Sequence, residues 1–478
     1  MGTSETKNIH FRLYCLVWVQ LFFLTGGCVA NFARAADKRP AFSSSRYQED
    51  YRFLRDPSRR TDIFDPLKYF PLNDSESIVL TLGGETRQHF EFIENNNWGA
   101  GAQDNNGYYL QRYLGHADLH LGKRLRLFGQ VMSGILSGRR GGPRGVDKDP
   151  FDLNQGFVDL DLLSDTQQAL TVRAGRQEII FGSRRFFNYR ERPNMRLSHD
   201  AVMGIFNSGK WDIRAFGARP VNLSPDYFDN QSSNNNTVWG LYAVRDKLPL
   251  SIPVSMDVYY LGLNGFSTYD QGTAEELRHV IGTRLWGQWK AIDYNFEFMY
   301  QFGTFGARDI QAYVLASDTG YTVRFNGSRK VRLSLRADLY SGDKNPADGT
   351  LNSFNPFFPK GKHISQLAAT GLINQRDLHP RITMTLTEHW SFTTSAEFIW
   401  RDSLNDGIYS IGNGLLVSGR TSRARYVGTQ PEMEVKYTFN RHVDLKGIFV
   451  HFIAGEFLKQ TTPGKNITYL GSMLTFRF

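Results

Sequence analysis

The stretch that decides the fold is DYNFEFMYQF, at residues 293–302. Its aromatic residues alternate with Asp, Asn, Glu and Gln, which is the period-two pattern of a β-strand with two unlike faces. The stretches VRLSLRADLY (331–340) and EMEVKYTF (432–439) repeat this pattern. In all three, one face is apolar and the other is polar or charged. The sequence therefore predicts strands that separate an apolar environment from a polar one.

The same pattern, followed along the chain from Ser77 onward, predicts about eighteen strands. We expect them to begin near Ser77, Tyr108, Arg124, Asp152, Ala169, Ala201, Trp211, Thr237, Val254, Leu277, Ile292, Ile310, Val331, Arg381, Ser391, Pro431, Val443 and Asn466.

The connections between these strands alternate in length. Tight turns are predicted at 122–123, 165–168, 208–210, 326–328, 388–389 and 440–442. Longer polar loops are predicted at 95–107, 137–151, 182–198, 220–236, 264–276, 342–376 and 403–430. Short turns on one side and long loops on the other are typical of outer-membrane barrels. The predicted fold is all-β: a transmembrane antiparallel β-barrel of about eighteen strands, with short periplasmic turns and long extracellular loops.

Composition favours the same class of fold. Aromatic residues make up 14% of the chain, glycine is frequent at 45 residues, and mean hydropathy is −0.40. A polytopic helical membrane protein would need several apolar runs of about 18 residues or more, and the low hydropathy argues against it. A soluble β-sandwich or propeller remains the alternative fold, although neither needs alternating short and long connections.

The N-terminus reads as a secretory signal over residues 1–35, with a basic start, the apolar run 13–24 and a small-residue cleavage site at 33–35. Both cysteines, Cys15 and Cys28, lie within it, so the mature chain would contain neither disulfides nor thiolate metal sites. Its removal takes away two Arg, one Lys and one Glu, which lowers the net charge from +9 to +7. Residues 36–76 are predicted to be a periplasmic lead-in, and 77–478 the barrel.

The charged strand face is expected to point into the barrel. The predicted pore-lining cations are Arg87, Arg112, Arg173, Arg214, Arg284, Arg332, Arg336, Arg401 and Lys436. Interleaved lumen acids are Glu85, Asp118, Asp159, Asp161, Glu297, Asp338 and Glu434. Rings of Arg or Lys make a pore prefer anions. The alternative role for any one of these arginines is a structural ladder with the neighbouring carboxylates.

A more specific pattern lies within LTVRAGRQEIIFGSRRFFNYRERPNMRLSHDAVMGI, at residues 170–205. It contains Gly175-Arg176-Gln177, Arg192-Pro193-Asn194, Arg196 and Asp200. This pattern resembles the alginate-export outer-membrane family, and so do the lead-in at 49–72 and the loop at 340–361. Strict alternation places Arg176 on the lipid face, so we expect either a bulge or a position at the barrel rim.

The resemblance implies an eighteen-stranded, passive channel lined by arginines, which carries an anionic polysaccharide. It transfers the pore-cation role to Arg87, Arg112, Arg173, Arg332 and Arg336. Expected partners are outer-membrane lipids, the barrel-assembly machinery, which would read the final strand ending in Phe478, periplasmic export partners, and an anionic polysaccharide or small anionic solute. The expected location is the Gram-negative outer membrane. Loop 342–376, with Phe354, Phe357 and Phe358, is expected either to constrict the mouth or to remain a surface loop.

The sequence lacks the short motifs of phosphate loops, serine hydrolases and zinc proteases. His116, Asp118 and His120 share a strand face, but they are more typical of a hydrogen-bonded patch than of a metal site. We therefore predict no enzyme activity, no metal, no cofactor and no nucleic-acid partner. The functional hypothesis is passive export of an anionic polysaccharide such as alginate. The alternative is a general porin, or one selective for sugars or anions, that takes up small solutes.

Overall fold

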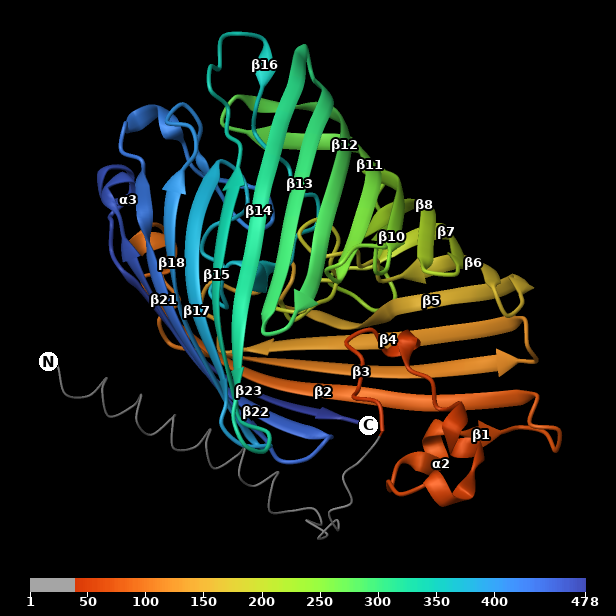
Figure 1. Ribbon diagram of the computed structural model, residues 1–478. Coiled ribbons are helices and arrows are strands. Elements are labelled where there is room, and N and C mark those ends of the chain that lie inside the picture. The colour runs from red at the N-terminus through yellow and green to blue at the C-terminus, as the bar shows by residue number, and fades with distance from the viewer. Residues whose placement is uncertain (1–38) are drawn as a thin grey trace, which may run out of the picture. The chain divides into compact units, whose positions relative to one another are not determined.

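A computed structural model describes residues 39–478 of the protein (Figure 1). The chain divides into two units, Met1–Glu49 and Asp50–Phe478. The described part of the first unit contains one 3-10 turn, η1 (Arg46–Gln48). The predicted signal segment, 1–35, lies outside the described residues. Within residues 39–478, none of the helices is long and apolar enough to cross a membrane.

The second unit is built on a closed antiparallel barrel of 18 strands. Strands that follow one another in the chain pair with one another, and β2 pairs with the last strand, β23, to close the ring. The barrel strands are β2 (Ile78–Glu94), β3 (Tyr108–Leu121), β4 (Leu125–Ser137), β5 (Asp149–Ser164), β6 (Gln168–Gln177), β7 (His199–Ser208), β8 (Trp211–Asn222), β10 (Thr237–Arg245), β11 (Val254–Tyr269), β12 (Gly272–Trp289), β13 (Ile292–Phe305), β14 (Arg308–Arg324), β15 (Lys330–Tyr340), β17 (Gln375–Thr385), β18 (Trp390–Arg401), β21 (Tyr426–Thr438), β22 (Val443–Ala454) and β23 (Ile467–Arg477).

Short elements occupy the connections and the lead-in. The strand segments are β1 (Phe70–Pro71), β9 (Gln231–Ser232), β16 (Thr350–Leu351), β19 (Ile408–Tyr409) and β20 (Leu415–Val417). The helical segments are η2 (Arg52–Arg55), η3 (Pro57–Arg59), α2 (Asp65–Lys68), η4 (Asn96–Gly99), η5 (Gly361–His363), η6 (Gly419–Thr421) and α3 (Glu456–Thr461).

The predicted barrel and its strand number are confirmed, but the predicted loop 264–276 is wrong. β11 and β12 run through this segment and meet in a tight turn at Asp270 and Gln271. β17 and β21 also begin earlier than predicted, at Gln375 and Tyr426. The first residues of β17, Gln375–Asp377, are polar on both faces, and β21 begins with Tyr426, Val427 and Gly428, so neither start shows the alternation by which strands are detected.

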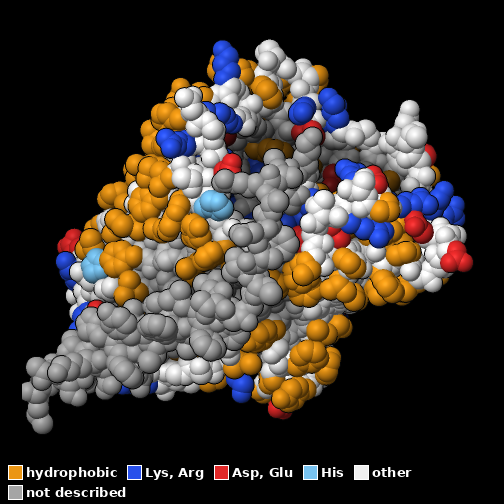
Figure 2. Space-filling model, turned by 90° about the horizontal axis from the view of Figure 1, so that it is seen from below, with side chains coloured by type: hydrophobic (Ala, Val, Ile, Leu, Met, Phe, Trp, Pro, Cys, Tyr) orange, Lys and Arg blue, Asp and Glu red, His pale blue; other side chains and the backbone are white. Residues whose placement is uncertain are grey.

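The outer face of the barrel is apolar. Phe296 and Phe298, from the stretch that decides the fold, are 47% and 43% exposed, whereas Glu297 between them is 6% exposed. Leu333 and Leu335 of β15 are exposed in the same way. Figure 2 shows hydrophobic side chains gathered over the described outer surface. Closure of the ring leaves no unpaired strand edge, which is what a sheet needs in order to span hydrocarbon.

The inner face is not uniformly charged. On β8 and β10–β14, apolar inward side chains lie among charged ones such as Arg278, Arg284 and Glu297, and the apolar ones form a core with residues of two long loops. The inward members include Phe216, Val238, Leu261, Val280, Met299 and Val314. Much of the aromatic content therefore lies inside the barrel, because loops that enter the lumen need an apolar wall to pack against.

The part of the lead-in that belongs to the second unit, residues 50–76, docks where the barrel closes. The Phe64 ring lies 5.2 Å from the ring of Phe478 and 6.0 Å from that of Phe476. The Asp62 carboxylate lies 2.7 Å from Nε2 of His442, in the turn between β21 and β22. Lys68 Nζ donates a hydrogen bond of 2.9 Å to the carbonyl of Leu82 on β2. The lead-in thus contacts the first strand, the last strand and the turn beside them.

Gly175 provides a test of how β5 and β6 fit together. Its φ is +127°, and a Cβ there would lie 2.3 Å from the carbonyl oxygen of Gly156. We expect Gly175→Ala to lower the free energy of unfolding by about 1–3 kcal/mol, measured by urea unfolding of the refolded barrel in detergent micelles.

Gly204→Ala on neighbouring β7 is the matched control, because a Cβ there would lie 4.0 Å from the nearest carbonyl oxygen, that of Ala215. This variant should change stability by less than about 0.5 kcal/mol. Equal effects of the two substitutions would contradict the close approach at Gly175.

Candidate functional site

The predicted pore cations occupy inward positions of their strands, alternating with exposed apolar residues. Arg87, Arg112, Arg173, Arg284, Arg336 and Arg401 are buried. Arg214, Arg332 and Lys436 are partly exposed. The predicted acids share this face: Glu85, Asp118, Asp159, Glu297 and Asp338 are buried, and Asp161 and Glu434 are partly exposed. The placement follows from strict two-residue alternation along regular strands.

Most of these cations have carboxylate partners on the wall itself. Arg173 Nε lies 2.6 Å from Asp159, and the Arg284 guanidinium 2.6 Å from Asp257. The remaining wall pairs are Arg214 with Asp212, Arg332 with Asp293 and Asp318, Arg336 with Asp377 and Glu397, and Lys436 with Asp444. Ladders of this kind neutralise both partners, so these groups stabilise the wall more than they attract ions.

Arg401 behaves differently. Its guanidinium is fully buried and donates to the carbonyls of Ser422 and Ala424, among others in the loop between β18 and β21. It also lies 4.0 Å from the ring centroid of Phe457. Arg401 therefore fixes a long loop at one end of the barrel and does not face an open passage.

The predicted acids are also engaged. Asp118 pairs with Arg126 at 2.8 Å, and Asp161 accepts a hydrogen bond of 2.6 Å from Thr171. Glu434 forms an ion pair with Lys362 of the loop between β15 and β17. Glu297 and Asp338, on different strands, both pair with Arg185 of the loop between β6 and β7, at 2.7 and 3.5 Å. Loop cations thus reach the wall acids from inside the barrel.

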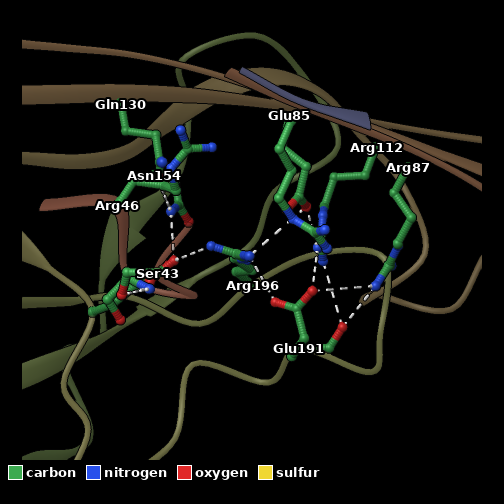
Figure 3. A network of polar contacts seen from close by, with 12 residues as sticks. Ser43, Arg46, Glu85, Arg87, Arg112, Gln130, Asn154, Glu191 and Arg196 are labelled. Atoms are coloured by element: carbon green, nitrogen blue, oxygen red, sulfur yellow. Dashed lines mark hydrogen bonds and ion pairs between the residues drawn. The ribbon is translucent and has the colours of Figure 1, made fainter. Parts of the chain in front are cut away.

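Glu191, in the loop 178–198, is the centre of a second network (Figure 3). Its carboxylate contacts Arg112 at 2.5 Å and Arg196 at 2.7 Å, and its carbonyl accepts a hydrogen bond of 2.7 Å from Arg87. Arg112 also pairs with Glu85 at 2.7 Å. Burial works against the charged form of Glu191, but the guanidinium groups of Arg112 and Arg196 hold its pKa well below the ordinary value.

The motif residues account for the way this loop is held. Asn194 Nδ2 donates to the carbonyls of Gln111 and Asp147, both at 2.9 Å, and the Pro193 carbonyl accepts from Arg87 at 2.8 Å. Arg192 donates to the carbonyl of Gln366, in the loop 341–374 between β15 and β17. Gln177 Nε2 donates to the Ala201 carbonyl at 3.3 Å.

Arg176 faces outward, near the end of β6. Its guanidinium pairs with Asp200 on β7 at 2.9 Å and donates to the Asn230 carbonyl at 3.1 Å. No register shift falls at Arg176 in the pairing of β6 with β5 or β7, so its side chain keeps the outward direction that strict alternation gives it.

The loops 178–198 and 341–374 meet inside the barrel. The Phe358 N–H donates to the carbonyl of Phe186 at 2.8 Å, and the Asn188 N–H donates to the carbonyl of Phe358 at 3.1 Å. The rings of Phe354 and Phe357 lie 5.6 and 5.1 Å from that of Phe186. The expected aromatic cluster of loop 342–376 therefore packs within the lumen, and the two loops together narrow it.

A small group of cations remains without carboxylate partners. Among the residues that the structure describes, the side chains of Lys360 and Arg381 have no ion pair or hydrogen bond. Both are partly exposed. Burial, together with repulsion from Arg184, Lys362 and Arg381, lowers the pKa of Lys360 to about 8. We call Lys360 and Arg381 the free cation pair.

Sequence reasoning missed both members of this pair. Arg381 lies on the inward face of β17, and it was overlooked because that strand begins six positions earlier than predicted, at Gln375. Lys360 belongs to a loop, where no periodicity indicates direction. Within residues 39–478 there is no group of His, Cys, Asp and Glu placed to hold a metal ion. His116 instead stacks on Phe128, with ring centroids 5.7 Å apart.

Solved structures share this architecture at low sequence identity. Vanillate-bound OpdK of Pseudomonas aeruginosa is 8% identical, with a TM-score of 0.55 over 84% of this chain and 98% of that one. A BenF-like porin from Pseudomonas fluorescens is 10% identical, with a TM-score of 0.55 over 84% and 99%. Pseudomonas aeruginosa OccK2 in complex with glucuronate is 10% identical, with a TM-score of 0.53 over 86% and 98%. These likenesses establish the porin-type barrel fold.

The sequence itself matches a family. A search of curated protein sequences finds no match. The family model described as alginate export matches residues 78–471, which is the barrel from β2 into β23. The barrel fold, the apolar outer face and this match place the protein in the Gram-negative outer membrane as a channel. The chain therefore belongs to the alginate export family.

Proposed function

We propose that this channel passes an anionic polysaccharide such as alginate passively outward through the barrel. The observation that carries the proposal is the free cation pair, Lys360 and Arg381, inside a lumen whose other named arginines are bound to carboxylates or carbonyls. A polyuronate carries a carboxylate on each sugar. Its carboxylates would contact these cations one after another. Because each contact is weak, the polymer could leave as readily as it enters.

The difference between the paired and the unpaired cations supports this proposal. Ladder arginines such as Arg173 and Arg336 hold the wall rigid and are already neutralised. Lys360 and Arg381 retain their positive potential within a low-dielectric ring, which concentrates anions locally. The match to an alginate export family supports the outward direction.

The second candidate function is a porin for small anionic solutes. The aromatic core formed by loops 178–198 and 341–374 favours it, because this core occupies part of the lumen and leaves less room for a polymer. The structures named above with vanillate and glucuronate, each a carboxylate, belong to proteins that share only the fold.

The first test is ion selectivity in planar bilayers. We expect Lys360→Gln combined with Arg381→Gln to lower the anion-to-cation permeability ratio about fivefold, since each exposed charge acts on a passing ion with about 0.5 kcal/mol. Arg214→Gln, which removes a cation paired with Asp212, is the control and should change the ratio less. An unchanged ratio in the double variant would exclude the free cation pair as the selectivity site.

The pKa of Lys360, about 8, predicts a pH dependence. Below that pH the ammonium is charged and attracts anions, and above it the neutral amine does not. Anion selectivity, measured from reversal potentials, should therefore fall between about pH 7 and 9. Lys360→Arg keeps its charge throughout this range and should remove the dependence. If the dependence persists in that variant, another group is responsible.

Block of the open channel distinguishes the two candidate functions. Alginate oligosaccharides of increasing length should interrupt the current for increasing times, because a longer chain places more carboxylates near Lys360 and Arg381. A small-solute porin would respond to glucuronate as strongly as to the oligomers, and that result would favour the second function.

A further inference from the structure

The lead-in carries apolar side chains on its outside. Ile63, Leu67, Phe70 and Leu72 are between 40% and 69% exposed. They lie in and around α2 and β1, beside the end of β2 (Figure 1). We call these four residues the lead-in apolar surface.

Charged side chains of the same segment point the other way. Asp65 and Lys68, on either side of Leu67, are 1% and 2% exposed. Lys68 Nζ donates to the carbonyl of Leu82 and lies 5.4 Å from the ring centroid of Phe478. A segment surrounded by water would bury its leucine and expose its ions. The inverted arrangement is that of the barrel wall, which buries its charges and turns apolar residues to lipid.

β1 places part of this surface in register with the wall. Phe70 is paired with Leu80 of β2, and the Leu72 N–H extends the pairing by donating to the Ile78 carbonyl at 2.8 Å. Leu80 and Ile78 each lie an odd number of positions from the inward Arg87, so both face outward. Paired residues of antiparallel strands share a face, and Phe70 and Leu72 therefore point toward lipid.

The outward wall on the other side of β2 is also apolar. Leu119 and Leu121 of β3 stand opposite Leu80 and Ile78, and Leu127 of β4 stands opposite Leu119. The tight turn between β3 and β4 marks this as the short-turn end, which is the periplasmic end in barrels of this class. Apolar side chains thus form one band from β4 across β3 and β2 to β1.

The start of α2 is held against the outside of the last strand. Phe476 stands opposite Thr86, whose neighbour Arg87 faces inward, so the Phe476 ring points toward lipid. The Phe64 ring packs against it, with centroids 6.0 Å apart. Phe64, and Ile63 next to it, therefore lie on the lipid side of β23.

We propose that the lead-in apolar surface lies in the periplasmic leaflet of the outer membrane, in contact with phospholipid acyl chains. Continuity identifies the occupant, because the surface extends in register a wall that already faces hydrocarbon. The segment is short, so it would lie at the boundary between headgroups and acyl chains, as interfacial segments do. The lead-in would then be an anchor at the membrane surface beside the periplasmic mouth.

The test is the accessibility of a spin label in liposomes of phosphatidylethanolamine and phosphatidylglycerol. Residues 39–478 contain no cysteine, so a single introduced thiol can be labelled alone. Leu67→Cys and Leu72→Cys place the label on the surface, and Asp74→Cys, at an exposed position just beyond it, is the control. The accessibility to oxygen, divided by that to a water-soluble nickel chelate, should be about fivefold higher at the two leucines than at Asp74.

Two results would overturn the proposal. Equal ratios at the three positions would show that the surface faces water. Labels at Leu67 and Leu72 that are shielded from both oxygen and the nickel chelate would show that protein, and not lipid, covers it.

A second variant separates lipid contact from the fold. Phe70→Ser combined with Leu72→Ser, in the Leu67→Cys background, makes part of the surface polar. The accessibility ratio at Leu67 should fall about threefold as the segment withdraws from the acyl chains, while heat-modifiable gel migration stays unchanged. Asp74→Ser is the matched control and should leave the ratio intact. A ratio that survives the loss of both apolar side chains would refute the contact through β1.

Discussion

Hydrocarbon offers the peptide backbone no hydrogen-bond partner, and the pairing of β2 with β23 is what lets this chain meet that constraint. Once the ring is closed, every strand has one face in lipid and one inside. The inner face must then satisfy its own charges away from bulk water, and arginines paired with carboxylates do so. The ladders, the inserted loops and the narrowed lumen all follow from that enclosed polar surface.

The inserted loops, 178–198 and 341–374, occupy part of the space that closure of the ring creates. A barrel of this size would enclose a wide aqueous channel. Loop 178–198 is tied down by Arg87 and Arg112, and loop 341–374 by Arg336, whose guanidinium donates to the His363 carbonyl. The wall arginines therefore serve chiefly as anchors. The proposed function assigns transport to the smaller set of cations that these anchors leave unpaired.

The two-residue period was enough to derive the strand number and the inward placement of residues such as Arg173 and Asp338. The barrel also needed the alternation of short turns with long loops. The strand ends around Asp270 could not be found, because β11 and β12 have polar residues on both faces there. Lys360 could not be found either, since its position depends on contacts between two loops distant in sequence. The pairing of Arg87 with the Glu191 carbonyl is likewise long-range and leaves no local pattern.

The docking of the lead-in has a consequence for biogenesis. Phe64 packs on Phe478 and Phe476, and Asp62 binds His442, so the N-terminal segment finds its place only among the residues made last. The N-terminal segment cannot dock while β23 is still unpaired. Docking of this segment therefore indicates that the ring is complete, and its protection from proteases distinguishes a closed barrel from a partly inserted sheet.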